Sequence, residues 1–153
     1  MSEVNHRASL IPAVFYKDPR AALQFLEKAF GFEPTMIITD DDGNVSHSEM
    51  SFGGGCIMVG GEWDVHTTKS PASVGGANTQ NVHVQLTEDI DAHCERARAA
   101  GAQVVAEPED QFYGDRTYRA KDPEGHMWTF GQTLRIVSSE EMAKASGLKF
   151  ELG

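Results

Sequence analysis

The sequence predicts an α+β fold made of two tandem βαβββ modules. Two amphipathic helical segments share one plan, and short strand-like runs flank both of them in the same order. Turn glycines of the two halves also keep one spacing, since Gly31 to Gly101 and Gly55 to Gly125 are both 70 residues apart. Repetition of this kind indicates two copies of one structural unit. We therefore expect each copy to be a sheet with a helix on one face, leaving the other face free to form a cavity.

The two main helices are predicted from their caps and their apolar stripes. Asp18 is a suitable N-cap and Pro19 fits the first helical position, while Gly31 favours termination. Asp89 and Gly101 have the same roles in the second helix. The inner faces at helical spacing are Ala22, Leu23, Leu26, Ala29 and Phe30 in the first helix, and Ile90, Cys94 and Ala97 in the second.

Strands are expected wherever β-branched and aromatic residues form short runs between turn residues. In the first half these runs are 10–16, 35–39, 44–52 and 56–60, and in the second half they are 81–86, 103–107, 116–121 and 126–130. The glycines at 53–55 are interpreted as a hairpin turn. Ser138 and Glu141 form a capping box that predicts a short helix over 139–146.

These elements divide a single domain, residues 1–153, into four parts. The first module covers 8–60 and the second covers 81–134, while 135–153 is a C-terminal helical tail. Between the modules lies a loop, 61–80, rich in Gly, Ser, Thr and Asn. Structureless loops of this length are uncommon in compact domains, so we expect a functional lid or a crossover.

Composition excludes several classes of function. The chain has 40% hydrophobic and 24% charged residues, the profile of a soluble globular protein. Its net charge of −10 argues against nucleic acid and against an anionic membrane surface as partners. No apolar run has the length of a membrane span or of a signal-peptide core, so we expect a cytoplasmic protein. The two isolated cysteines, Cys56 and Cys94, are expected to be reduced and to pack as small apolar side chains.

Strand alternation places a set of polar side chains on the helix-free side of the fold. Candidate catalytic residues are His47 and Glu49, because a His and a Glu two apart on a strand share a face and can act as base and partner. The candidate ligand-binding residues are Asn81, His83, Gln85 and Arg119. We call all six residues the polar constellation. Two alternatives stay open, namely an ordinary solvated sheet and a polar dimer seam. Arg119 is expected either to bind an anionic ligand group or to pair with Glu49.

The stretch "KDPEGHMWTFG", residues 121–131, joins a turn to the last predicted strand. Here we expect His126 to close the turn by a hydrogen bond and Trp128 to lie in the core. Asp115 and Arg116 in the preceding "YGDR" are expected to fix a loop. The histidines interpreted as facing solvent, with no function assigned, are His6, His66 and His93.

The double βαβββ plan, "KDPRAALQFLEKAFGF" and "YGDRTYRAKDPEGHMWTF" together resemble the vicinal oxygen chelate superfamily of glyoxalases, bleomycin-resistance proteins and extradiol dioxygenases. The resemblance covers roughly residues 8–134 and points to the PhnB-like, glyoxalase-like branch of small bacterial proteins. It implies a sheet-lined cavity for a small-molecule ligand. It also implies a homodimer, in which modules are sometimes exchanged. A fold of this kind hosts many reactions, so the resemblance does not name one.

For metal-using members, the resemblance implies four ligands from the first and last strands of both modules. The repeat places these positions near Ile11, Val59, Asn81 and Thr129. Isoleucine and valine do not bind metals, and asparagine and threonine are poor choices beside His, Glu and Cys. A slip of two residues would bring His83 into a ligand position. We therefore expect no metal site and no cofactor.

Three functional hypotheses stay open at this point. The first is a glyoxalase-like or bleomycin-resistance-like protein that binds or transforms a small organic molecule in a cavity without a tightly bound metal. If it is an enzyme, a lyase- or isomerase-like activity is the expected type. The second is a non-catalytic module that sequesters a small molecule. The third is a metal-dependent lyase or isomerase with a relocated ligand set from His47, Glu49 and His83.

Overall fold

The computed structural model describes residues 7–65 and 67–152 of the chain. The first module runs through β1 (Ala13–Tyr16), α1 (Pro19–Phe25), β2 (Glu33–Thr39), β3 (Val45–Phe52) and β4 (Gly55–Gly61). The second module runs through β5 (Val82–Leu86), α2 (Ile90–Ala99), β6 (Gln103–Asp110), β7 (Asp115–Lys121) and β8 (Met127–Thr133), and α3 (Ser139–Ser146) follows. The predicted α+β fold of two tandem βαβββ modules is confirmed.

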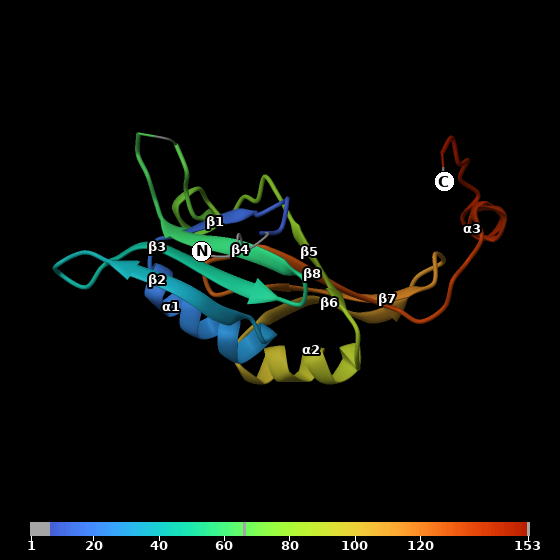
Figure 1. Cartoon of the computed structure of the whole chain (residues 1–153). Coiled ribbons are helices and arrows are strands. Elements are labelled where there is room, and N and C mark those ends of the chain that lie inside the picture. The colour runs from blue at the N-terminus through green and yellow to red at the C-terminus, as the bar shows by residue number, and fades with distance from the viewer. Residues whose placement is uncertain (1–6, 66, 153) are drawn as a thin grey trace, which may run out of the picture.

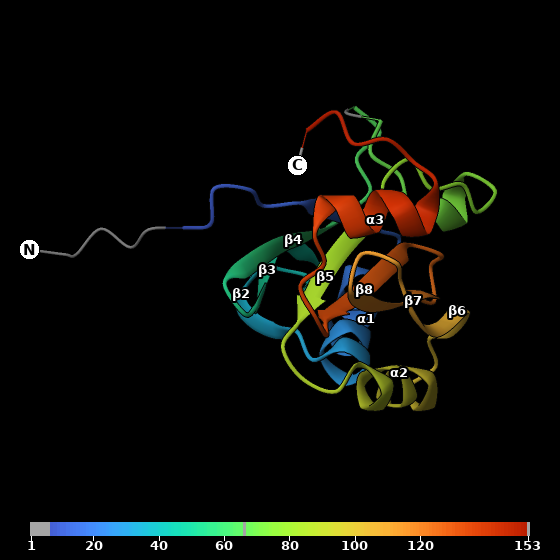
Figure 2. The same ribbon diagram turned by 90° about the vertical axis from the view of Figure 1, so that its right-hand side faces the viewer.

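Each module is a four-stranded mixed sheet with the same strand order. The orders are β1-β4-β3-β2 and β5-β8-β7-β6, and the first strand of each module pairs in parallel with the last. Helices α1 and α2 lie on one side of the two sheets, whereas the linker loop and α3 lie on the other (Figures 1 and 2). The helix-free faces of both sheets are therefore on the side of the linker and the tail.

The helix boundaries follow from the predicted caps. The side chain of Asp18 accepts a hydrogen bond from the Ala21 backbone, and Asp89 does the same for Ala92. Helix α1 continues into a wider π-helical turn, Leu26–Phe30, which ends at Gly31 with a φ of 82°. Ser138 caps α3 by accepting from the Glu141 backbone N–H. These local signals explain why the helix positions agree with the sequence.

One core spans both modules. The apolar stripes of α1 and α2 are buried, and Phe30 of the first module contacts the rings of Trp128 and Phe130 in the second. Trp128 is fully buried, as predicted. Aromatic contacts of this kind add to the burial of apolar area, so the two modules stabilise each other.

The last hairpins of the two modules differ by one residue. Phe52 pairs with Gly55 across a two-residue turn, whereas the Asp122 N–H donates to the His126 carbonyl and leaves three residues between them. The offset between equivalent residues is therefore 70 before the turn, as for Glu49 and Arg119, but 71 after it. The ladders thus make Met58 the equivalent of Thr129.

The C-terminal tail leaves the body of the second module after β8. Its start packs on Gly114, which has a φ of 97° and lies so close to Arg135 that an added Cβ would stand 2.2 Å from the Arg135 carbonyl oxygen. Helix α3 buries none of its residues. Within the described residues, none of the helices combines the length and the apolar character needed to span a bilayer.

Candidate functional site

A cavity of about 410 Å³ lies where the two modules meet, and we call it the linker cavity. Strand β1 and the residue before it, Pro12–Phe15, form one wall, and Val82, Met127 and Trp128 form another. Residues between Thr67 and Gln80 of the linker complete it. Its strand walls are largely apolar, while the linker adds Lys69, Asn78 and several hydroxyl groups beside the apolar Pro71, Val74 and Ala77. This mixture is typical of small-molecule sites.

The linker is fixed over the cavity by hydrogen bonds to the β7–β8 turn. The Ser70 hydroxyl donates to the Glu124 carboxylate over 2.7 Å. Asn78 donates to the Gly125 carbonyl over 2.8 Å and accepts from the Met127 N–H over 3.0 Å. Both ends of the loop are thus held by the second module. The cavity is therefore part of the folded chain and does not depend on a ligand to form its walls.

The same turn also joins the second module to the first. The Asp122 carboxylate is nearly buried and accepts from the Tyr16 hydroxyl over 2.6 Å and from the Trp128 indole over 3.1 Å. The Glu124 carboxylate accepts from the backbone N–H groups of Lys17 and Asp18. The turn therefore holds the start of the first helix, the linker and the cavity wall in one arrangement.

The polar constellation separates into two groups. In the first group, on β3, the His47 Nε2 and the Glu49 carboxylate are 2.8 Å apart. The Glu49 side chain also accepts from Arg7. Arg7 was not among the predicted site residues, and nothing in its sequence context marks it. Because Glu49 takes Arg7 as its partner, the alternative pairing of Glu49 with Arg119 is not formed.

The second group lies on the sheet of the second module. Asn81 and Thr129 are hydrogen bonded at 2.9 Å, while His83 contacts Gln85, which donates to Thr133. Arg119 is exposed and stands opposite Thr129 in the ladder. Within the described residues, no hydrogen bond or ion pair joins the two groups, and none of the six residues lines the linker cavity. The six side chains therefore do not gather in that cavity, and they lie on two separate sheets.

The electrostatics of the first group favour a charged carboxylate. The hydrogen bond from His47 lowers the pKa of Glu49, and Arg7 acts in the same direction against the opposing effect of burial. A carboxylate held in this way can fix the orientation of the His47 ring by accepting from Nε2–H. The Nδ1 atom of His47 then remains available as a proton acceptor.

Two histidine interpretations need correction, and two others concern residues outside the described chain. The ring of His126 does not close its own turn, because Nε2 donates to the Phe15 carbonyl over 2.6 Å. The Asp122 carboxylate closes the turn by accepting from the His126 backbone N–H. His93 is not solvent-facing, since its ring lies between the Tyr118 hydroxyl and the Phe30 carbonyl. His6 and His66 lie outside the described residues. The contacts of His126 and His93 are with residues far away in the sequence, so sequence spacing contained no signal for them.

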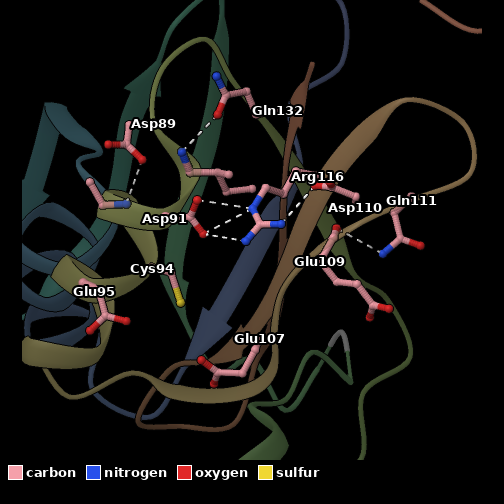
Figure 3. A network of polar contacts seen from close by, with 12 residues as sticks. Asp89, Asp91, Cys94, Glu95, Glu107, Glu109, Asp110, Gln111, Arg116 and Gln132 are labelled. Atoms are coloured by element: carbon pink, nitrogen blue, oxygen red, sulfur yellow. Dashed lines mark hydrogen bonds and ion pairs between the residues drawn. The ribbon is translucent and has the colours of Figure 1, made fainter. Parts of the chain in front are cut away.

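Arg116 has a wider role than the one predicted. Its guanidinium lies between Asp91 of α2 and Asp110 of β6, with a forked contact to Asp91 (Figure 3). It therefore ties a helix to two neighbouring strands, and its ion pair with Asp110 also spans the loop 111–114. The Asp115 carbonyl accepts from the Gln111 N–H and closes that loop through the backbone.

The expected metal positions shift once the ladders are known. Val59 is fully buried and stands opposite Val14, so it faces the helices. In the ladders, Ala13 pairs with Met58 as His83 pairs with Thr129. Ala13 is therefore the equivalent of His83, and Met58 is the equivalent of Thr129. His83 thus takes a position equivalent to a first-strand ligand. Across the described residues, no three His, Cys, Asp or Glu side chains are grouped so that they could hold a metal ion.

The sequence did not identify the residues that line the linker cavity. The length and the polar composition of the 61–80 loop were the only signals, and they indicated a lid or a crossover without its partners. Lys69 and Asn78 line the cavity from this loop. Val82 and Met127 line it from the starts of two strands, where the sequence pattern assigned Val82 to the core and gave Met127 no role. A wall built by two modules depends on their packing, which local sequence patterns do not encode.

Comparisons with known proteins agree with this architecture. Residues 4–130 match the family model of the Glyoxalase/Bleomycin resistance protein/Dioxygenase superfamily. The uncharacterized protein Rv0887c of Mycobacterium tuberculosis is 33% identical over 150 residues, covering 93% of this chain and 84% of that protein. The crystal structure of TioX from Micromonospora sp. ML1 is similar with a TM-score of 0.68 and 31% identity, covering 83% of this chain and 99% of TioX.

A more distant structure shares the fold alone. TnmS3, an antibiotic-binding protein from Streptomyces sp. CB03234, has a TM-score of 0.62 at 17% identity, covering 87% of this chain and 99% of TnmS3. The family match covers most of the chain, and the similarity to the mycobacterial relative covers 93% of this chain. The repeated modules, their strand order and these matches together show that the chain belongs to the glyoxalase/bleomycin resistance protein/dioxygenase superfamily.

Proposed function

We propose that the protein binds a small organic molecule in the linker cavity. The observation that carries this proposal is the cavity itself, whose volume of about 410 Å³ falls in the usual range of roughly 300–1,000 Å³ for ligand sites. Its strand walls are largely apolar, and its linker wall offers a few hydrogen-bonding groups. The antibiotic binding named for TnmS3 supports the proposal at the level of the fold only. The ligand class is thus a compact molecule with an apolar body and polar groups at one side.

The test fills part of the cavity with a larger side chain at a linker position. Val74 lines the cavity from an exposed position, so Val74→Trp adds bulk there without changing the shared core. The probe is 8-anilinonaphthalene-1-sulfonate, whose fluorescence rises in apolar surroundings. We expect Val74→Trp to weaken probe binding at least about tenfold. The matched control is Val105→Trp, an exposed valine outside the cavity wall, which should leave binding unchanged.

A second measurement locates the probe. The chain has two tryptophans, Trp63 and Trp128, and only Trp128 lines the cavity. In Trp63→Phe, energy transfer to the bound probe must therefore come from Trp128. Efficient transfer that Val74→Phe reduces in the Trp63→Phe background, where no new tryptophan is introduced, would support the cavity. Equal binding by Val74→Trp and Val105→Trp would reject it as the ligand site.

A second candidate function is catalysis by His47 with Glu49 as its partner. The observation favouring it is the 2.8 Å contact, which orients the imidazole as a general base requires. In this reading, Asn81, His83, Gln85 and Arg119 contact the ligand on the other sheet, which requires a partner chain or a large ligand to connect the faces. The test follows conversion of compounds that raise the melting temperature. His47→Asn should abolish conversion and keep the thermal shift, whereas loss of the shift alone would indicate a binding role.

The remaining expectations concern assembly, metal and location. We propose a homodimer, supported by the exposed apolar side chains of the C-terminal tail. The absence of a tightly bound metal stays a prediction from the ligand positions, to be checked by elemental analysis after dialysis against a mild chelator. About one metal ion per chain would instead favour the lyase or isomerase hypothesis with a relocated ligand set. The PhnB-like branch and the cytoplasmic location also remain predictions from the sequence.

A further inference from the structure

The carboxylate of Glu49 is nearly buried on the helix-free face of the first sheet, with 7% of the residue exposed. The ladder places Met36 of β2 and Met58 of β4 directly opposite Glu49 on its two sides. Directly opposed residues share a face, so two methionines frame the carboxylate. Ile38 stands opposite the neighbouring His47 in the same way. The strands on both sides thus offer adaptable methionines to this negative charge, which the His47 ring and the Cys56 thiol also contact.

The main cationic partner of Glu49 comes from the start of the chain. Arg7 donates to the carboxylate over 2.5 Å across 42 positions of sequence. The segment 7–12 that carries it forms neither helix nor strand, and Leu10 within it is 86% exposed. The side chain of Arg7 is itself half exposed, whereas that of Glu49 is 9% exposed. The guanidinium thus reaches a fixed carboxylate from a segment with little other support.

The two sides of this ion pair differ in how easily they are replaced. A carboxylate withdrawn from water needs a cation or strong donors, so Glu49 favours an occupied state. Half-exposed arginines, by contrast, contribute little to an ion pair, because water and salt compete for them. A ligand cation with an apolar body would keep the carboxylate neutralised and would also cover Met36 and Met58. The chain's net charge of −10 attracts such cations before contact.

We propose that Glu49 is the anchor of a site for apolar organic cations, carrying an amidinium, guanidinium or ammonium group, and that Arg7 is an intramolecular competitor for it. The charged group of the ligand replaces the Arg7 guanidinium on the carboxylate, and the apolar body rests between the methionines. This site shares no residue with the linker cavity. It therefore stands whether or not that cavity binds a ligand.

The probe for the test is p-aminobenzamidine, which combines a planar amidinium with an aromatic ring. An amidinium matches a carboxylate with two parallel hydrogen bonds. We expect Arg7→Gln to bind the probe more tightly, because a competitor present in roughly nine-tenths of molecules reduces apparent affinity about tenfold. Arg135→Gln is the matched control, since Arg135 is exposed and pairs only with Glu141 among the described residues. It should leave the affinity unchanged.

A second variant and a neutral probe complete the design. Glu49→Gln should weaken binding of p-aminobenzamidine at least about tenfold in the wild-type and Arg7→Gln backgrounds alike. The neutral analogue p-aminobenzamide should not respond to Arg7→Gln. Circular dichroism checks that Glu49→Gln is folded, and the NMR signal of the Arg7 side chain provides a test in the unchanged protein. Saturating p-aminobenzamidine should shift that signal to the position of a solvated arginine.

Three results would overturn the proposal. The first is equal affinity of the wild type and Arg7→Gln for p-aminobenzamidine, which would mean that Arg7 does not compete. The second is unchanged binding by folded Glu49→Gln. The third is an Arg7 signal that does not move when p-aminobenzamidine is saturating.

Discussion

At the scale of single residues, His93 shows how one side chain joins the two modules. Its Nε2 donates to the Phe30 carbonyl over 2.9 Å, and its Nδ1 accepts from the Tyr118 hydroxyl over 2.6 Å. Burial raises the pKa of Tyr118 far above its usual range, so this hydroxyl keeps its proton as donor. Burial favours the neutral imidazole, and both of its ring nitrogens are satisfied when Nε2 carries the proton. The site therefore selects one tautomer of an uncharged histidine.

This selection predicts an acid-sensitive fold. Burial lowers the pKa of His93 below its usual value of 6.5, so the unfolded chain binds a proton more readily than the folded one. The contribution of His93 to stability is therefore fully present above about pH 6.5 and is lost as the pH falls below that value towards the folded-state pKa. Thermal unfolding of His93→Gln should show a shallower dependence on pH in this window. NMR titration of the His93 ring gives the folded-state pKa directly, and an unchanged slope in the variant would contradict the assignment.

At the scale of elements, the loop before β7 and the start of the tail depend on one glycine. Gly114 adopts a φ of 97°, which side-chain-bearing residues rarely accept, and its Cα faces the Arg135 backbone at close range. The Leu134 and Arg135 N–H groups both donate to the Gly114 carbonyl. The glycine thus allows two backbone segments to meet where a Cβ would separate them. This contact sets the direction in which the tail leaves the sheet.

The prediction at this scale compares two glycines. Gly43 has a φ of 83°, close to that of Gly114, but open space where a Cβ would stand. Gly43→Ala should therefore cost about 1 kcal/mol from the left-handed backbone alone. Gly114→Ala carries the same strain and also a collision with backbone atoms, so we expect a loss of at least about 2 kcal/mol. Urea unfolding of both variants measures the difference. Equal losses would show that the tail moves aside without cost.

At the scale of the whole molecule, the C-terminal tail has apolar side chains without cover in the single chain. The most exposed ones are Ile136, Leu148 and Leu152, with Ile136 98% exposed. Helix α3 has eight residues and buries none of them. Helices of that length are marginal in water without tertiary contacts. These exposed apolar side chains, on a short helix without buried residues, support the proposed homodimer, in which a second copy covers the tail.

The homodimer predicts a concentration-dependent mass in sedimentation velocity experiments. Ile136→Glu places a charge at the most exposed apolar position of the tail, and burying it is costly. We expect this variant to weaken self-association at least about tenfold. Val65→Glu makes a similar change at another exposed position, outside the tail, and should retain the wild-type mass. A wild type that stays monomeric at all concentrations, or Ile136→Glu that assembles normally, would contradict the prediction.

The sequence by itself determined the helices, most of the strands, the repeat and the core. Asp18, Asp89 and Ser138 cap helices because capping depends on groups three residues away, and Trp128 is buried because its strand alternates. Such signals depend on residues of one element, so the packing of the two modules does not change them.

Only the tertiary structure decided which side chains meet. Glu49 takes Arg7 across 42 positions, and the His126 ring reaches Phe15 across 111. The one-residue difference between the two hairpins moved the expected ligand positions, and the linker cavity exists only because β1 lies against the starts of β5 and β8. Contacts between distant segments depend on how two modules pack, and no periodicity within a segment records that packing.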